Sequence, residues 1–562
     1  MKKVLRTMAW LLGLLLVLPT GVLAEVNLDS ALPIVTEELS VTIGVFPQGA
    51  MVMSEFDEET FWNIRYLNEV TGLDIEWQVY DPASKSEVLA LMMAGGEMPD
   101  LLMGQSWSID DVNEYGVLQG LLYPIDTLLE YMPTFSGIME KQPELRAVLT
   151  APDGHIYSFP HIGDAKYSYP LRFWINQEWL ANVGLENPTT IDELHEVLTA
   201  FKEEDANGNG DPNDEIPFTG SWDEGYSERK LFLAFFGLAE SNNLAVDYTM
   251  DANVEDRDII YVPYAPEYKE YLALMHQYWS EGLFDPDLFT QSEVQAVAKE
   301  EDDLTGIWGG ASPNSTLTSF PHPFETWDAL NMVTGPNGET PAINYYPLIY
   351  VFGGAAISAS CDPEKAAALA NLMDYYYTPE WYNFNWYGPE YGSEYDYDNN
   401  GCYYDDETVG YAFKGMEDKD MTRWTYKCTY VTFWETPGYH TVGNMYYEEE
   451  WAKANPDSVV AQLIEGQGGI FQTYEQLLNR AIVPYYVEGI PPMFFSEEDV
   501  ERTQLLQSQL NDYVTNAEVK FITGELDLNA DYNNFIADLE AYGVLELLDI
   551  YNTYYNVYKS NL

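Results

Sequence analysis

The sequence predicts a mixed α/β protein made of two lobes. At 562 residues the chain is too long for one compact core, so at least two globular units are expected. Its apolar fraction of 46% and aromatic fraction of 15% supply enough core side chains to exclude a disordered chain. Strand-like and helix-like segments alternate in two separate stretches. Two such α/β units leave a crevice between them in which ligands bind.

The first α/β stretch follows a short tether at 25–38 and reads as strand, helix, strand, helix, strand. Its strands alternate or are fully apolar, and its first helix ends at Gly72, which suits the left-handed position after a helix. Short links between these elements imply a parallel sheet. The expected strands are 40–47, 73–80 and 101–104, and the expected helices are 57–72 and 84–100.

The second stretch repeats this alternation and ends in a helical region. Thr190 and Glu193 form a capping-box pattern at the start of an amphipathic helix, and Pro363 stands at the first position of another. The expected strands are 172–180, 305–312 and 350–360, and the expected helices are 190–205, 267–282, 362–377 and one within 496–528. We predict that the first lobe comprises 39–165 and 335–395, and the second lobe 166–334 and 396–562.

Residues 1–24 have the pattern of a secretory signal peptide. Lys2, Lys3 and Arg6 precede an apolar run at 8–18, and small residues ending at Ala24 suit a cleavage site. The run is shorter than the roughly 20 residues that a membrane-spanning helix needs. We therefore expect an exported protein at the cell surface or outside the cell. No cysteine lies near the cleavage site, so a lipid anchor is not indicated.

The net charge of the chain is extreme. It has 25 Lys and Arg against 92 Asp and Glu, a formal charge of −67. Such a surface repels nucleic acid and anionic lipid, because no basic face is available to neutralise phosphate. The net charge therefore argues against nucleic acid and anionic lipid as partners, but it does not indicate which ligand the protein binds.

The stretch "DANGNGDPNDEIP" at 205–217 resembles a calcium-binding loop. Oxygen-bearing side chains alternate at its start, and Gly210 occupies the sixth position, where such a loop turns sharply. Position twelve, which normally carries a carboxylate, is Ile216, so this is not a regular sensor loop. The alternative is a polar turn rich in Asn and Gly. The predicted Ca²⁺ ligands are Asp205, Asn207, Asn209, Asp211 (through its carbonyl), Asp214 and Glu215, and their ion would be structural.

Several ordered motifs resemble the extracellular solute-binding proteins of carbohydrate ABC transporters. The long segment "RFWINQEWLANVGLENPTTIDELHEVLTAFKEEDANGNGDPNDEIP" is similar to a helix and calcium loop of the alginate-binding members. The segments "MAGGEMPDLLMG", "EGLFDPDLFTQ" and "EVKFITGELDL" match further family patterns. The resemblance implies a type II periplasmic-binding-protein fold with a hinge. It also implies a protein that closes on a carbohydrate and delivers it to a membrane permease.

The candidate binding residues are aromatic and polar side chains expected on loops at strand ends. Flat aromatic rings suit the C–H faces of sugars, and amide or carboxylate groups suit their hydroxyls. Core packing is the alternative role for each residue. The chosen residues are Gln105, Trp107, Arg172, Trp222, Trp308 (flanked by glycines that would admit a ligand), Trp386, Tyr387 and Glu390. Because basic residues are scarce, a neutral oligosaccharide is preferred over a polyanion.

Two rival functions remain at this stage. An exported glycoside hydrolase would need only two suitably spaced carboxylates, and 92 acidic residues offer many pairs. The sequence contains no G-x-S-x-G, H-E-x-x-H or P-loop pattern, so we expect no enzymatic activity. A peptide-binding or sensor protein on the same scaffold is the second rival, since a fold does not determine its ligand. We expect a monomer.

Overall fold

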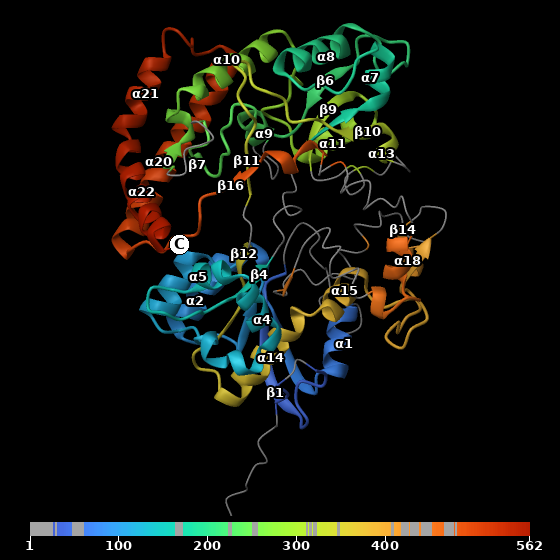
Figure 1. Cartoon of the computed structure of the whole chain (residues 1–562), viewed down its shortest axis with the longest axis vertical. Helices are drawn as coiled ribbons and strands as arrows, with labels where there is room; N and C mark the ends of the chain where they lie inside the picture. Colours follow the sequence, from blue (N-terminus) through green and yellow to red (C-terminus); the bar gives the residue numbers. More distant parts are fainter. Residues whose placement is uncertain are drawn as a thin grey trace, which may run out of the picture.

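A computed structural model defines the fold of most of the chain. The leader at 1–24 and the tether residue Glu25 lie outside the part that it describes. The described residues are 26–28, 31–47, 61–162, 172–222, 228–249, 257–310, 313, 317, 323–345, 349–405, 410–416, 426, 438–439, 452–465, 477 and 480–561. They form two lobes, one above the other in Figure 1.

The first lobe is built on a six-stranded sheet with the order β15-β4-β12-β3-β1-β2. The pairs β1–β2 and β1–β3 are parallel, as predicted, whereas β12 runs antiparallel to both β3 and β4. The strands are β1 (Leu39–Val45), β2 (Leu73–Val79), β3 (Leu101–Met103), β4 (Phe159–Ile162), β12 (Ile349–Ile357) and β15 (Gly438–Tyr439).

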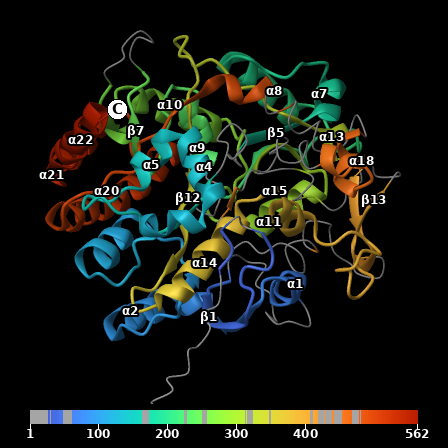
Figure 2. The same ribbon diagram turned by 60° about the horizontal axis from the view of Figure 1, so that its bottom comes forward.

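Helices cover this sheet, and the view in Figure 2 shows α14 lying close to β1. Pro363 begins α14, as predicted, because a proline at the first helical position loses no hydrogen bond. Helix α2 ends where Gly96 adopts a left-handed conformation. The α-helices are α1 (Trp62–Val70), α2 (Lys85–Gly95), α3 (Ile109–Asp111), α4 (Pro133–Lys141), α5 (Pro143–Leu149), α14 (Pro363–Tyr376) and α15 (Pro379–Tyr387), with a π-helix at Val112–Leu118 and 3₁₀ turns at Pro82–Ser84 and Ile125–Tyr131.

The second lobe is built on a four-stranded sheet with the order β10-β5-β9-β6. One prediction was wrong here: the strand expected at 172–180 ends at Asn176. The Asn176 side chain accepts hydrogen bonds from the backbone of Glu178 and Trp179, and so caps α7. The elements are β5 (Arg172–Asn176), α7 (Gln177–Val183), α8 (Ile191–Glu203), β6 (Ile216–Thr219), α9 (Glu228–Ala234), α11 (Glu293–Glu301), β9 (Thr305–Gly310), α13 (Pro323–Thr326) and β10 (Trp327–Ala329).

Three C-terminal helices complete the second lobe. They share one hydrophobic core with the second sheet and lie beside α10 in Figure 1. A short parallel pair of strands, β11 with β16, also joins residues 343–345 to residues 486–488, which precede the C-terminal helices. The elements are β7 (Leu244–Val246), β8 (Ile259–Tyr261), α10 (Glu267–Ser280), β11 (Ile343–Tyr345), β16 (Tyr486–Glu488), α20 (Glu497–Thr523), α21 (Tyr532–Ala541) and α22 (Val544–Asn561), with 3₁₀ turns at Val262–Tyr264 and Val483–Tyr485.

The segment after α15 stays with the first lobe. Its apolar side chains form one cluster with Trp62 of α1, and Asp398 pairs with Arg65 at 2.8 Å. Strand β15 also joins the first sheet. This packing differs from the predicted boundary at residue 396, which gave all later residues to the second lobe. The segment contains β13 (Cys402–Asp405), β14 (Gly410–Phe413), a 3₁₀ turn at Lys414–Met416 and α18 (Val459–Glu465).

Candidate ligand-binding site and metal loop

Three predicted binding residues lie at one end of the second sheet. Trp308 in β9 pairs with Thr219, the last residue of β6, and Trp222 follows three residues later. Arg172, the first residue of β5, pairs with Gly310 at the end of β9. The fold therefore brings Arg172, Trp222 and Trp308 to the same edge, where the parallel strands β6 and β9 end.

The rings of these residues are held by protein contacts. Trp308 is 1% exposed and packs edge-on against Trp327, with ring centres 5.9 Å apart. The guanidinium of Arg172 lies 5.6 Å from the ring centre of Trp174, a cation–π contact. Trp222 is also buried and packs against the ring of Phe289. In this conformation the rings are parts of the core, and they offer a ligand little of their faces.

Glu228, which sequence reasoning missed, lies at the same edge. It begins α9, is 2% exposed, and accepts a hydrogen bond at 3.2 Å from the backbone N–H of Ser221. A Cβ on Gly309 would lie 2.8 Å from Cγ of Glu228, so only glycine fits there. The glycines flanking Trp308 were predicted to admit a ligand. Instead, Gly309 makes room for Glu228 and Gly310 makes room for the Trp308 ring.

Several buried polar atoms at this edge have no hydrogen-bond partner among the described residues. They are Oε2 of Glu228, Oγ of Ser221 and Nε1 of Trp308. Burial, and to a smaller extent Glu293, raises the pKa of Glu228 well above its usual value, which favours the carboxyl group that can donate as well as accept. An unpaired buried polar group costs about 1–3 kcal/mol. A ligand with several hydroxyl groups would relieve that cost.

The first lobe carries a smaller set of the same kind directly after β3. Gln105 and Trp107 follow this strand and are both buried. The Trp107 ring packs in a core cluster with Phe46 and Tyr157 and has no exposed surface. Oε1 of Gln105 and Nε1 of Trp107 have no hydrogen-bond partner within the described part of the chain. A ligand could therefore contact these two residues only through their polar atoms, Oε1 of Gln105 and Nε1 of Trp107.

The remaining three predicted residues lie elsewhere in the first lobe. Trp386 stacks on Tyr382 with ring centres 6.2 Å apart, and Tyr387 meets Tyr411 edge-on at 5.7 Å. Glu390 accepts a hydrogen bond from the backbone N–H of Val459 at 3.0 Å. Tyr387 and Glu390 line a separate cavity of about 550 Å³. This cluster does not include the residues around Trp308.

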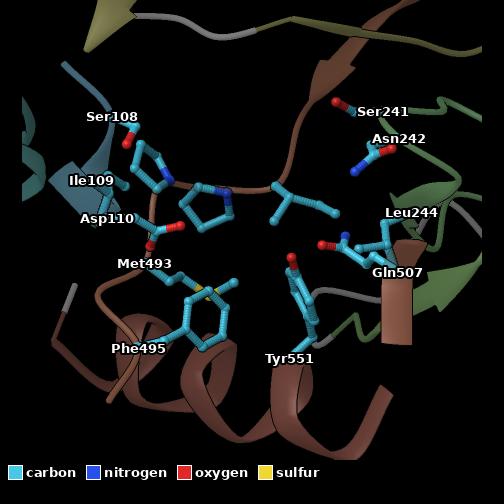
Figure 3. Close-up of a pocket in the computed structure, with 13 residues that line it drawn as sticks. Ser108, Ile109, Asp110, Ser241, Asn242, Leu244, Met493, Phe495, Gln507 and Tyr551 are labelled. Carbon is cyan, nitrogen blue, oxygen red and sulfur yellow. The ribbon is translucent and has the colours of Figure 1, made fainter. Parts of the chain in front are cut away.

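A pocket of about 450 Å³ lies where the two lobes meet, and we call it the seam pocket. Figure 3 shows its lining side chains. Its walls are residues 108–110 of the first lobe, parts of 241–244 and 490–495, and Gln507 and Tyr551 of the C-terminal helices. Residues 108–110 follow Trp107 directly in the chain. The seam pocket is therefore next to Gln105 and Trp107, whose polar atoms Oε1 and Nε1 lack partners among the described residues.

The predicted calcium loop follows α8 and has the turn that such a loop needs. Gly210 has a left-handed φ of 95°, and its N–H donates to both carboxylate oxygens of Asp205 at 3.1 and 3.2 Å. The side-chain amides of Asn207 and Asn209 both donate to Asp214, at 3.2 and 2.8 Å. These hydrogen bonds hold Asn207 and Asn209 against Asp214 and tie Asp205 to the turn at Gly210.

Glu215 tests whether this loop fits a cation. Both of its carboxylate oxygens are buried and lack a hydrogen-bond partner among the described residues. Burial, then Asp214 and Asp205, raises its pKa. Carboxylates crowded together without a basic partner suit a hard cation. Across the described ranges, no three His, Cys, Asp or Glu side chains converge into a ready metal centre, so amide and carbonyl oxygens would have to complete the set.

Comparison with known proteins gives full-length similarities. The sequence is 27% identical over 520 residues to FusA, the fructooligosaccharide ABC transporter substrate-binding protein of Streptococcus pneumoniae serotype 4, covering 89% of this chain and 87% of FusA. The structure of FusA in complex with kestose matches with a TM-score of 0.70 at 25% identity, covering 93% of this chain and 100% of FusA. No protein-family model matches the chain.

Two more distant structures share the fold. An HMO-binding solute-binding protein from Bifidobacterium longum infantis has a TM-score of 0.69 at 19% identity, covering 93% of this chain and 99% of its own. The alginate-binding protein AlgQ2, solved without calcium ion, has a TM-score of 0.62 at 18% identity, covering 95% and 100%. At these identities the matches concern the fold alone.

The two lobes have the type II periplasmic-binding-protein fold of solute-binding proteins. Each lobe carries buried polar groups beyond its strand ends that lack a partner among the described residues. The chain is similar over most of its length to the substrate-binding proteins of carbohydrate ABC transporters, of which FusA is one.

Proposed function

We propose that the protein captures a neutral oligosaccharide between its two lobes and delivers it, chemically unchanged, to an ABC transporter permease. One observation carries the choice of ligand: in both lobes, buried polar atoms at strand ends lack a hydrogen-bond partner among the residues that the structure describes. The names of FusA and its kestose complex support a carbohydrate of more than one ring. A net charge of −67 disfavours a polyanionic ligand.

Capture would work by lobe closure. Gln105 and Trp107 would contact the ligand from the first lobe, and Ser221, Glu228 and Trp308 from the second. A ligand that contacts both walls binds the closed arrangement better than the open one, and so shifts the population toward closure. None of these residues needs to form or break a covalent bond in this process.

The loop at 205–215 would hold a structural Ca²⁺ through the six predicted residues. The ion would fix the end of α8 to the start of β6, because the loop joins these elements. A solved form of FusA is called an EF-hand mutant and AlgQ2 was solved without calcium ion, which supports a calcium loop in this chain.

Export by the N-terminal leader would place the protein at the cell surface, where the permease is reached, and we propose that it acts as a monomer. Residues 1–24 lie outside the described ranges. Among the residues that the structure does describe, no helix has the length and apolar character needed to cross a bilayer.

A panel of neutral oligosaccharides, sugar acids and peptides tests this function. Thermal shift would select binders, calorimetry would measure affinity, and chromatography would follow the ligand after incubation. We expect saturable binding of a neutral oligosaccharide that is recovered intact. Hydrolysis of the sugar would favour a glycoside hydrolase, and binding of peptides alone would favour a peptide receptor; either result would exclude the proposal.

A further inference from the structure

The seam pocket brings together four polar side chains from four separate parts of the chain. Asp110 belongs to α3, Asn242 precedes β7, Gln507 lies on α20 and Tyr551 on α22. In Figure 3 the polar ends of these side chains face a common space. Residues from distant parts of the sequence thus offer carboxylate, amide and hydroxyl groups to one small volume.

The hydrogen bonds of Asn242 direct its amide into the pocket. Its Oδ1 accepts from the Nδ2 of Asn511 at 2.8 Å, so its own NH₂ group is the part that faces the pocket in Figure 3. On another wall, Oδ2 of Asp110 lies 3.4 Å from the amide of Gln504, a long contact that leaves the carboxylate able to accept further hydrogen bonds. Donor and acceptor groups are therefore both present.

Aromatic and apolar side chains form the floor of the seam pocket. The rings of Phe495 and Tyr551 meet edge-on with centres 5.1 Å apart, and Met493 lies beside them. An apolar floor with polar groups around it matches the surface of a sugar ring, which has C–H faces and a rim of hydroxyls.

The charge and size of the pocket narrow the ligand further. Among its described lining residues none is Lys or Arg and Asp110 is the one acidic side chain, so these residues would repel an anionic ligand. The volume of about 450 Å³ lies in the lower part of the range for small-molecule sites. A ligand of one or two rings fits these limits.

We propose that the seam pocket is a second carbohydrate site, separate from the edge around Trp308, which binds a neutral mono- or disaccharide. Its walls come from both lobes, and Asn113 of the first lobe also reaches the carbonyl of Phe495 across the seam at 3.4 Å. Occupation of the pocket stabilises this arrangement of the lobes, because the pocket exists only when they meet.

Ligand-observed NMR titration of the full chain with sucrose, fructose and glucose tests the proposal. We expect at least one of these sugars to bind, and Gln507→Ala to weaken that binding about tenfold through loss of a direct hydrogen bond. Gln509→Ala is the matched control, because Gln509 is an exposed glutamine of the same helix that does not line the pocket. It should leave the affinity unchanged.

A third variant separates this site from the proposed oligosaccharide site. Trp308→Phe, which keeps a ring in the core, should impair binding of the longer oligosaccharide and leave the small-sugar affinity unchanged. Loss of small-sugar binding in a folded Trp308→Phe variant would overturn the second site but not the transport function. Equal small-sugar affinities of Gln507→Ala and Gln509→Ala, no binding of any of the three sugars, or a preference for a small cation such as choline would also overturn it.

Discussion

A buried ion pair attaches the C-terminal helices to the second lobe, and breaking it should have a large effect. Nε of Arg229 in α9 donates to both carboxylate oxygens of Glu518 in α20, at 3.0 and 2.8 Å. Glu518 is 2% exposed and also accepts hydrogen bonds from the hydroxyls of Tyr268 and Tyr271. The pair therefore sits almost without solvent between α9, α10 and α20.

Arg229→Met would leave the carboxylate of Glu518 buried with only two hydroxyl donors. Removing one partner of a buried ion pair costs about 3–5 kcal/mol, because the remaining charge is neither solvated nor paired. The hydroxyls of Tyr268 and Tyr271 still donate to Glu518, but the buried Glu240, 3.4 Å from Arg229, also loses its partner. A loss within the range of about 3–5 kcal/mol is therefore expected. Asn243 also loses a 2.8 Å hydrogen bond from Arg229, which adds to the cost.

Urea unfolding followed by tryptophan fluorescence measures this loss. Arg502→Met is the control, because Arg502 and Glu546 also join two C-terminal helices, but their side chains are 41% and 48% exposed. Exposed pairs contribute little, so the control should unfold close to the wild type. If Arg229→Met unfolds at the same urea concentration as Arg502→Met, the buried pair does not hold these helices, and the reasoning fails.

Three further predictions concern the loop and the ligand edge. Chelation of Ca²⁺ should lower the melting temperature, by the equivalent of about 2.7 kcal/mol if Ca²⁺ was present at a hundred times its Kd. Glu215→Gln should abolish this effect of chelation, whereas the control Glu203→Gln, at the exposed end of α8, should retain it. An unchanged wild-type melting temperature would exclude the ion. The raised pKa of Glu228 means that folding takes up a proton, so wild-type stability should fall as pH rises from the unfolded value near 4.5 toward the folded value. Glu228→Gln should flatten this part of the pH–stability curve, although Glu300, whose pKa is also raised by burial, still contributes. Superimposable curves would contradict this expectation. Trp308→Phe should weaken oligosaccharide binding about tenfold in calorimetry, because it removes the indole N–H. The control Trp279→Phe in α10 should leave the affinity unchanged. If both variants bind the oligosaccharide equally well, Trp308 is not part of the site.

The sequence predicted those elements whose signals are local. The helix expected at 190–205 is Ile191–Glu203, and the Thr190 side chain caps it by accepting from Glu193. The helix expected at 267–282 is Glu267–Ser280, followed by a left-handed Gly282. The apolar stripe lies within the helix that it defines and the capping residue directly precedes it, so both can be recognised without tertiary contacts.

The wrong strand at 172–180 shows where local reading fails. Its residues are largely apolar or aromatic and suit either a strand or a helix. Asn176 decides between them by accepting from two backbone N–H groups, and asparagine is a strong N-cap. The signal was present at Asn176, but the aromatic residues around it favoured an extended interpretation.

The candidate site was predicted only in part, because it depends on contacts between distant residues. Trp308 and Arg172 were chosen from the sequence, and the structure places both at the same edge of the second sheet. Glu228 was not chosen, because nothing near it in the chain reveals that Gly309, about 80 residues later, leaves space for its side chain. The seam pocket was not predicted either, since it joins residues 108–110 to Tyr551.

The same fold serves ligands of different charge, and the residues of this chain indicate which kind it binds. A polyanion such as alginate requires several basic side chains at the site. Here Arg172 is the one basic residue of the candidate set, and it is fully buried against Trp174. Glu228 favours its neutral form, and no described lining residue of the seam pocket is Lys or Arg. Under the proposed function, recognition would therefore depend on hydrogen bonds to hydroxyl groups, which do not require charge on the ligand.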